Sequence, residues 1–265
     1  MHSDEFAIDS TETLEELGHR NFRLIQKKSG FRYGEDTVLL AYFASQMASR
    51  KRRTLKVAEL GTNCGAASIL LAARREDVVI DGVEIQWEAA GVFAKNIRIN
   101  HLDDRIKSYC CDIRDFSSSG PEEIKRASYD MVFFNPPYYV PGRGPVPEKA
   151  EESRERMEAR CEVSGTLKDF MKAADWLLLP QGKMILVQRA SRLPEVLAHM
   201  AENHLEPSRI RFVHVRPEKP ATLFLLSGHK HGKPGGFQVM PPLILYREDH
   251  TYSDELHSIY GEEGE

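Results

Sequence analysis

The sequence predicts an α/β fold: a mostly parallel sheet of seven strands, with an antiparallel strand at one edge and helices on both faces. From residue 55 onward, short apolar runs alternate with segments whose apolar residues recur at helical spacing, which is typical of a parallel sheet covered by helices. The last two strand-like runs, 209–214 and 221–227, have no helix between them and should pair antiparallel. A length of 265 residues suits a single domain with a sizeable core.

Each element can be assigned in chain order. A short strand over 22–26 and a turn-rich connection precede a helix over 36–49, for which Asp36 is the expected N-cap. We expect one domain spanning 1–265, made of an N-terminal extension over 1–54 and a core over 55–265. The other core strands are expected over 55–60, 78–84, 106–111, 129–135 and 184–188, and the helices over 66–75, 86–100, 166–178 and 194–203.

Composition excludes several classes of protein. Apolar residues make up 41% and charged residues 29% of the chain, close to the average for globular proteins, which argues against disorder or a fibrous fold. No apolar run approaches the roughly 18 residues of a membrane helix. The acidic first residues lack the basic start and apolar middle of a secretory signal. We therefore expect a cytoplasmic protein without a membrane partner, and no obligate protein partner is evident.

The cysteines and histidines indicate neither a disulfide framework nor a metal site. Cys64, Cys110, Cys111 and Cys161 have no C-x-x-C spacing, so we expect four reduced thiols. The ten histidines show no ligand spacing. The sequence thus predicts no metal cofactor.

The net charge of −4 is unevenly distributed. The first 20 residues carry six acids and one arginine, and the last 18 carry seven acids and no lysine or arginine, so the body over 21–247 has a net charge of +8. A basic body can bind a polyanion such as RNA, although each basic cluster taken singly can equally be a solvated face. The candidate RNA contacts are Arg52, Arg53, Arg154, Arg156 and Arg160, with Tyr139 at the start of a long loop over 136–164.

The turn after the strand over 55–60 is a candidate ligand site, with the sequence Glu59-Leu60-Gly61-Thr62-Asn63-Cys64-Gly65. Its glycines let the backbone approach a ligand, and the next helix offers free N–H groups. The third glycine of a dinucleotide fingerprint is missing, and a plain strand-to-helix turn explains the pattern about as well. The next two strands end at Glu84 and Asp112, and acids at one rim of the sheet favour a nucleoside-type ligand.

The strongest motif is Asn135-Pro136-Pro137-Tyr138, directly after an apolar strand. The prolines fix the backbone and remove two N–H donors, so the Asn135 side-chain oxygen and the Pro136 carbonyl form a rigid pair of acceptors. Tyr138 adds a flat ring. This arrangement suits a planar group that bears an NH₂, such as adenine or a carboxamide, and it makes these four residues the candidate catalytic set. A strand that merely ends in a proline turn is the plain alternative.

Together, the motifs E-L-G-T-N-C-G, V-E-I, C-D-I and N-P-P-Y resemble those of the class I S-adenosylmethionine-dependent methyltransferases, which have a Rossmann-like fold. The opening F-R-L-I-Q-K-K-S-G-F-R-Y-G-E-D-T and the ending L-I-L-Y-R-E-D-H-T-Y-S-D-E-L are similar to those of the tRNA1(Val) (adenine-37-N6)-methyltransferase family. This resemblance spans residues 12–262. It implies N6-methylation of an adenosine in tRNA, with S-adenosylmethionine as the cofactor, S-adenosylhomocysteine as the product and tRNA as the partner.

The resemblance also implies a set of cofactor contacts. Family members usually have Asp and Gly where this chain has Glu59 and Asn63, and Cys161 replaces a histidine in the run over 159–162. Asn63 is compatible with binding because asparagine tolerates left-handed backbone. The implied contacts are Tyr33, Gly34, Asp36 and Thr37 closing over the methionine moiety; Glu59, Gly61, Asn63 and Gly65 at the methionine end; Glu84 and Ile85 at the ribose and adenine; and Asp112 and Ile113 at the adenine amine.

Two other functions fit part of the pattern. A glutamine N5-methyltransferase acting on a protein would present the same acceptors to a carboxamide. Such enzymes carry a helical substrate domain before the fold, whereas the residues before 55 match the tRNA family here. A non-catalytic RNA-binding relative of the fold is the other alternative, motivated by Asn63, and a failure to bind S-adenosylmethionine would favour it.

Overall fold

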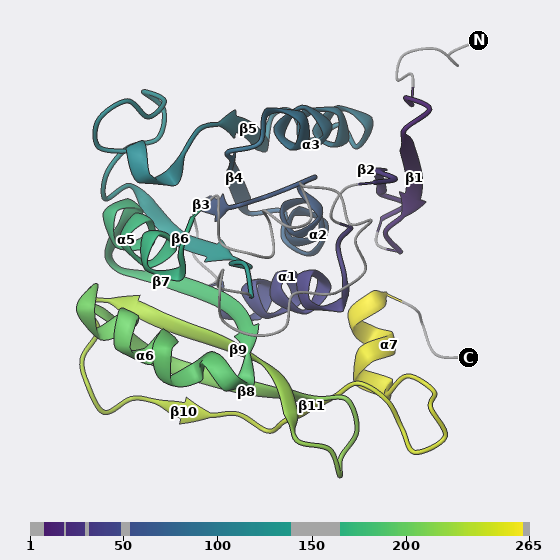
Figure 1. Ribbon diagram of the computed structural model, residues 1–265, viewed down its shortest axis with the longest axis vertical. Helices are drawn as coiled ribbons and strands as arrows, with labels where there is room; N and C mark the ends of the chain where they lie inside the picture. Colours follow the sequence, from purple (N-terminus) through teal and green to yellow (C-terminus); the bar gives the residue numbers. More distant parts are fainter. Residues whose placement is uncertain (1–7, 19, 30–31, 49–53, 139–164, 262–265) are drawn as a thin grey trace.

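The computed structural model describes residues 8–18, 20–29, 32–48, 54–138 and 165–261, and its centre is a parallel sheet (Figure 1). The parallel strands are β3 (Leu55–Leu60), β4 (Val78–Glu84), β5 (Ile106–Cys110), β6 (Tyr129–Phe134) and β7 (Leu178–Arg189). They lie in the order β7-β6-β3-β4-β5, so the chain reverses its direction of travel across the sheet between β3 and β6. Open α/β sheets bind ligands at such a switch point, beyond the carboxyl ends of the strands.

The predicted fold class is confirmed, and the sheet is larger than expected at one end. β8 (Leu205–His214) and β9 (Ala221–Lys230) pair antiparallel, as the missing helix between them predicted. The reversed strand β9 lies between β7 and β8 rather than at the edge, because the short connection after β8 turns the chain back into the space beside β7. Two short strands, β10 (Gln238–Val239) and β11 (Leu243–Ile244), pair with β8 and bring the sheet to nine strands.

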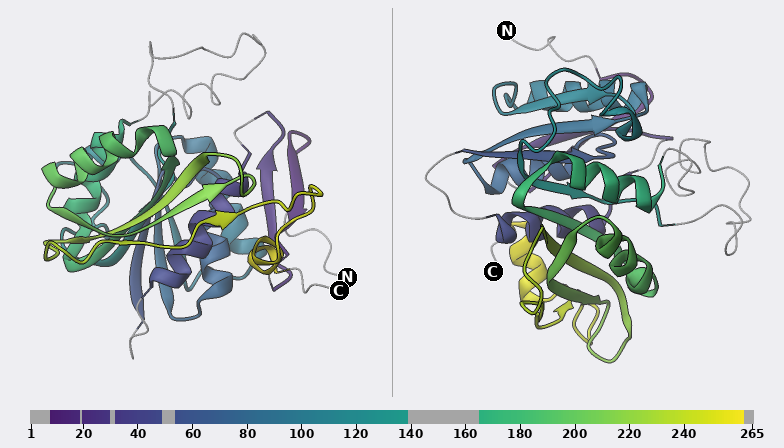
Figure 2. Two further views of the ribbon diagram at one scale, coloured as in Figure 1. Left: turned by 90° about the horizontal axis from the view of Figure 1, so that it is seen from below. Right: turned by 90° about the vertical axis from the view of Figure 1, so that its left-hand side faces the viewer.

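Helices cover both faces of the sheet (Figure 2). One core contains apolar residues of α1 (Glu35–Met47), α2 (Ala66–Arg74), α3 (Trp87–Ile99) and α7 (Asp254–Tyr260). The other contains residues of α5 (Leu167–Leu177) and α6 (Leu193–Glu202). Alternate residues of the strands enter the two cores: Val57 of β3 faces the first and Ala58 faces the second. No helix in the described ranges is long and apolar enough to cross a membrane.

One expected detail of α1 is wrong. The helix begins at Glu35, with Gly34 as its N-cap, so Asp36 occupies the second helical position. Its carboxylate still accepts a hydrogen bond from the Thr37 N–H at 2.8 Å, but it also reaches across to another loop, as described below. The remaining predicted strands and helices are present with shifted ends. The largest shift is in β7, which extends back to Leu178.

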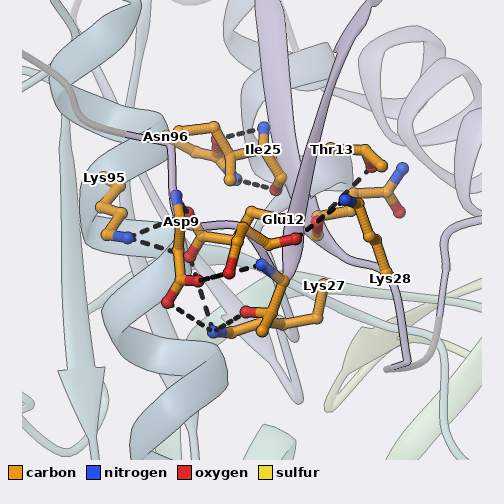
Figure 3. Close-up of polar contacts among 11 residues, drawn as sticks. Asp9, Glu12, Thr13, Ile25, Lys27, Lys28, Lys95 and Asn96 are labelled. Atoms are coloured by element: carbon orange, nitrogen blue, oxygen red, sulfur yellow. Dashed lines mark hydrogen bonds and ion pairs between the residues drawn. The ribbon is translucent and has the colours of Figure 1, made fainter.

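The N-terminal extension contains a hairpin that the acidic sequence did not reveal. β1 (Glu12–Glu16) pairs with β2 (Arg23–Lys27), and Figure 3 shows how α3 holds this hairpin. The side-chain amide of Asn96 accepts from the Ile25 N–H at 2.6 Å and donates to the Ile25 carbonyl at 2.8 Å. The buried carboxylate of Glu12 binds Lys95 Nζ at 2.9 and 3.0 Å. The Asn96 side chain thus pairs with both backbone groups of Ile25, as a residue of a neighbouring strand would.

Candidate active site

A cavity of about 390 Å³ opens at the carboxyl ends of β3, β4 and β6, at the switch point of the sheet. This volume is typical of small-molecule sites. The first turn of α1, from the N-terminal extension, forms another part of its wall. Thirteen of the predicted site residues line it: Tyr33, Asp36, Thr37, Glu59, Gly61, Asn63, Glu84, Ile85, Ile113, Asn135, Pro136, Pro137 and Tyr138.

The turn between β3 and α2 has the left-handed backbone that its sequence suggests. Gly61, Asn63 and Gly65 have φ values of +69°, +51° and +81°. A Cβ on Gly65 would lie 1.8 Å from Cδ2 of Phe93, so only glycine fits there. Asn96 also donates to the Cys64 carbonyl at 2.9 Å. The turn is therefore fixed both by its own residues and by α3.

Glu84 is buried at the end of β4 and anchors this turn. One carboxylate oxygen accepts from the Asn63 N–H at 2.8 Å, and the other accepts from the Gln86 N–H at 2.9 Å. Burial raises the pKa of Glu84. A carboxylate oxygen can accept more than one hydrogen bond, so both oxygens can also accept from a ligand.

Glu59 is buried at the end of β3, where its carboxyl accepts a hydrogen bond from the Ser68 hydroxyl. Burial raises the pKa of Glu59 from 4.5 to about 8. The folded protein therefore holds this carboxyl protonated at pH values where the unfolded chain has released the proton.

Removing this titration should change how stability depends on pH. As the pH rises from the pKa of Glu59 in the unfolded chain to its pKa in the folded protein, the free energy of unfolding should fall by up to about 1.4 kcal/mol per pH unit. Only the unfolded chain releases the proton in this range. Glu59→Gln keeps an acceptor for Ser68 but cannot titrate. Denaturant unfolding of both ligand-free proteins from pH 5 to pH 8 should therefore show the wild type losing stability relative to the variant. A constant difference would contradict the raised pKa.

Asn135 follows β6 directly and joins α1 through Asp36. Asn135 Nδ2 donates to Asp36 Oδ2 at 3.1 Å, and the Tyr138 hydroxyl donates to the same oxygen at 2.6 Å. Burial and the Asp36 carboxylate hold the pKa of Tyr138 well above its usual range, so its hydroxyl stays protonated. Arg192 donates to the Pro137 carbonyl at 2.9 Å.

Several predicted residues lie elsewhere. Gly34 and Gly65 are helix N-caps and do not line the cavity. Asp112 also lies outside the lining, and its carboxylate is bound by the side chain of Arg114, two residues further on. The candidate RNA contacts Arg52, Arg53, Tyr139, Arg154, Arg156 and Arg160 fall outside the described residues, as does Cys161.

The cavity contains residues that sequence reasoning missed. Arg189, at the carboxyl end of β7, has its guanidinium carbon 5.5 Å from the centre of the Tyr138 ring. Its position at the end of a predicted core strand could have identified it as a candidate site residue. Phe170 lies on the apolar stripe of α5 and was indistinguishable from a core residue. Cys64 and Cys111 also line the cavity, and burial raises the pKa of these thiols to about 12 and about 11, so both are neutral.

The strand order, the glycine turn at the switch point and the N-P-P-Y rim define a Rossmann-like methyltransferase. Residues 37–145 match the model of the methyltransferase small domain family. A tRNA1(Val) (adenine(37)-N6)-methyltransferase of Porphyromonas gingivalis is 30% identical over 202 residues, which cover 76% of this chain and 75% of that protein. The chain therefore belongs to the tRNA1(Val) (adenine(37)-N6)-methyltransferase family.

Two further comparisons cover more of the chain. The protein of the same name from Parabacteroides distasonis is 27% identical over 242 residues, which are 91% of this chain and 93% of that protein. A crystal structure of a predicted O-methyltransferase from Agrobacterium tumefaciens matches 86% of this chain and 96% of that chain, with a TM-score of 0.65 and 21% identity. The structural similarity supports the fold.

Proposed function

We propose that this protein transfers a methyl group from S-adenosylmethionine to N6 of an adenosine in tRNA, at position 37 of tRNA1(Val). One observation carries the proposal: the Asn135-Pro136-Pro137-Tyr138 rim lines the same cavity as the glycine turn that Glu84 anchors. A methyl donor and a flat base bearing an amine can therefore meet there. Membership of the family supports the choice of tRNA as the acceptor.

The residues at the glycine turn fit the cofactor. S-adenosylmethionine supplies an electrophilic methyl group when it is bound. Glu84 can accept from both ribose hydroxyls, because its carboxylate is held by two backbone N–H groups and still has lone pairs to offer. Ile85 lines the cavity beside Glu84 and provides an apolar contact for a purine ring. Gly61 and Asn63 bring the backbone close to the methionine end.

The acceptor side of the cavity acts by orientation. Asn135 Oδ1 and the Pro136 carbonyl, neither of which accepts a hydrogen bond from the described residues, can bind the two hydrogens of an exocyclic amine. This holds the nitrogen at a fixed position and favours its electron-rich form. Arg189 and Tyr138 make a cation–π contact at the cavity, and a base turned out of its strand can pack against these two side chains. Tyr138 remains a neutral donor to Asp36 and is not a base.

The proposal is tested by nucleoside analysis. Purified protein, S-adenosylmethionine and unmodified total tRNA should yield N6-methyladenosine detectable by mass spectrometry, in one tRNA species. A short oligonucleotide of the anticodon loop should be a poor substrate, because most phosphate contacts would be lost. Methylation of a protein glutamine instead would favour the alternative enzyme. Failure to bind S-adenosylmethionine would leave only a non-catalytic role.

We further propose that the basic run over 50–53 contributes phosphate contacts to tRNA, as expected for a cytoplasmic RNA-modifying enzyme. Reversing Arg52 and Arg53 to Glu should weaken tRNA binding and lower the slope of log affinity against log salt by roughly one per lost contact. The affinity of this variant for S-adenosylhomocysteine should be unchanged. Filter binding at several salt concentrations measures the slope, and the same reversal at exposed Arg98 and Lys107 provides a matched control. An unchanged slope would place the RNA face elsewhere.

A further inference from the structure

The Asp36 carboxylate connects two segments that are 99 residues apart in the chain. Its Oδ1 accepts from the Thr37 N–H at 2.8 Å, which fixes it on the first turn of α1. Its Oδ2 accepts from Asn135 Nδ2 at 3.1 Å and from the Tyr138 hydroxyl at 2.6 Å. Both oxygens therefore face donors, and one of them faces the loop that carries the N-P-P-Y motif.

A neighbouring carboxylate fixes the orientation of a side-chain amide. Asn135 has a donor end and an acceptor end, and rotation of the amide by half a turn exchanges them at little cost in shape. An ionised carboxylate only accepts, so the NH₂ end of Asn135 must face Asp36. The opposite end, Oδ1, is then the one available to a ligand in the cavity that Asn135 lines.

We propose that Asp36 is a positioning residue that fixes the Asn135 amide with its oxygen toward the acceptor amine, an inference that rests on the proposed methyl transfer. Without Asp36, the amide can turn its own N–H groups toward an amine that also donates, and that orientation cannot bind. Asp36 thereby selects acceptors that donate hydrogen bonds, such as an exocyclic amine, over groups that present an oxygen.

The charge of Asp36, rather than its shape, is the essential property. In Asp36→Asn the side chain keeps its size but gains an NH₂ group, which must oppose either the Thr37 N–H or the pair from Asn135 and Tyr138. We expect kcat for tRNA methylation to fall about tenfold or more, as for the loss of a group that orients the reacting atoms.

The matched control is Glu35→Gln. Glu35 is the neighbouring acid of the same helical turn, but it binds the Tyr246 hydroxyl and does not line the cavity. This variant should keep the wild-type kcat. If Asp36→Asn also keeps the wild-type kcat, the proposal is wrong.

A spectroscopic readout tests the same contact without relying on activity. In protein labelled with ¹⁵N-asparagine, loss of a side-chain signal in Asn135→Ala identifies the Asn135 NH₂ group. Its protons should exchange with solvent at least about tenfold faster in Asp36→Ala than in the wild type, because that variant has no acceptor for them. The buried amides of Asn96 and Asn100 report whether the fold is intact and should be unchanged.

The two readouts separate the possible failures. Unchanged exchange of the Asn135 protons would overturn the positioning role even if the wild-type protein methylates tRNA. If exchange is faster in the variant but the wild-type protein transfers no methyl group, the contact is established. Its catalytic meaning and the proposed function would then both be overturned.

Discussion

Replacing Asn135 with alanine should lower kcat for methyl transfer by about a hundredfold or more, because removal of one preorganised group at a reacting centre typically costs that much. The change removes Oδ1, the acceptor assigned to the substrate amine, and leaves the Pro136 carbonyl without its partner. Affinity for S-adenosylhomocysteine should barely change, since Glu84 and the glycine turn lie on different strands from Asn135.

Steady-state assays with saturating tRNA and radiolabelled S-adenosylmethionine measure this loss. Asn203→Ala is the control: Asn203 closes the end of α6 by donating to the His199 carbonyl at 2.7 Å, and it does not line the cavity. That variant should keep its rate. A residual kcat above about a tenth of the wild-type value in Asn135→Ala would be incompatible with the role given to Asn135.

Replacing Glu84 with alanine should have the opposite pattern. The cofactor would lose its acceptor for two hydroxyls, and the backbone N–H groups of Asn63 and Gln86 would lose theirs, so the turn would also loosen. Hydrogen bonds to a charged group contribute about 1.5–3 kcal/mol each, so the loss of two should raise the dissociation constant of S-adenosylhomocysteine at least about a hundredfold. The kcat at saturating cofactor should change much less.

Isothermal titration calorimetry with S-adenosylhomocysteine measures the affinity. Glu88→Ala removes an exposed acid from the first turn of α3, four residues further on, and should bind normally. An affinity in Glu84→Ala equal to that of Glu88→Ala would refute the ribose role of Glu84.

The sequence predicted the features that depend on local patterns. Strand β6, for example, is buried on both faces and therefore ends in a continuous apolar run, which polar Asn135 follows. The N-P-P-Y rim follows one such strand, so its place in the cavity could be anticipated. The left-handed turn at Asn63 was likewise readable, because few residue types adopt that backbone.

Features that depend on distant partners could not be predicted in this way. β1 reads as an acidic segment because the residue that hydrogen-bonds both oxygens of the buried Glu12 carboxylate, Lys95, is 83 residues away. Asp36 looked like a cap because its partners Asn135 and Tyr138 lie on another element. The short strands β10 and β11 have two residues each, too few to give an alternating pattern.

The Asn96 amide has a consequence for where this enzyme can be divided. Its two N–H groups are shared between the Ile25 carbonyl of the hairpin and the Cys64 carbonyl of the glycine turn, and its side chain is fully buried. A fragment starting at the first core strand would lose both hydrogen bonds between this amide and Ile25, each of which contributes about 0.5–1.5 kcal/mol. The segment before β3 therefore supports the glycine turn from behind through Asn96, and we expect a minimal catalytic fragment to begin ahead of β1.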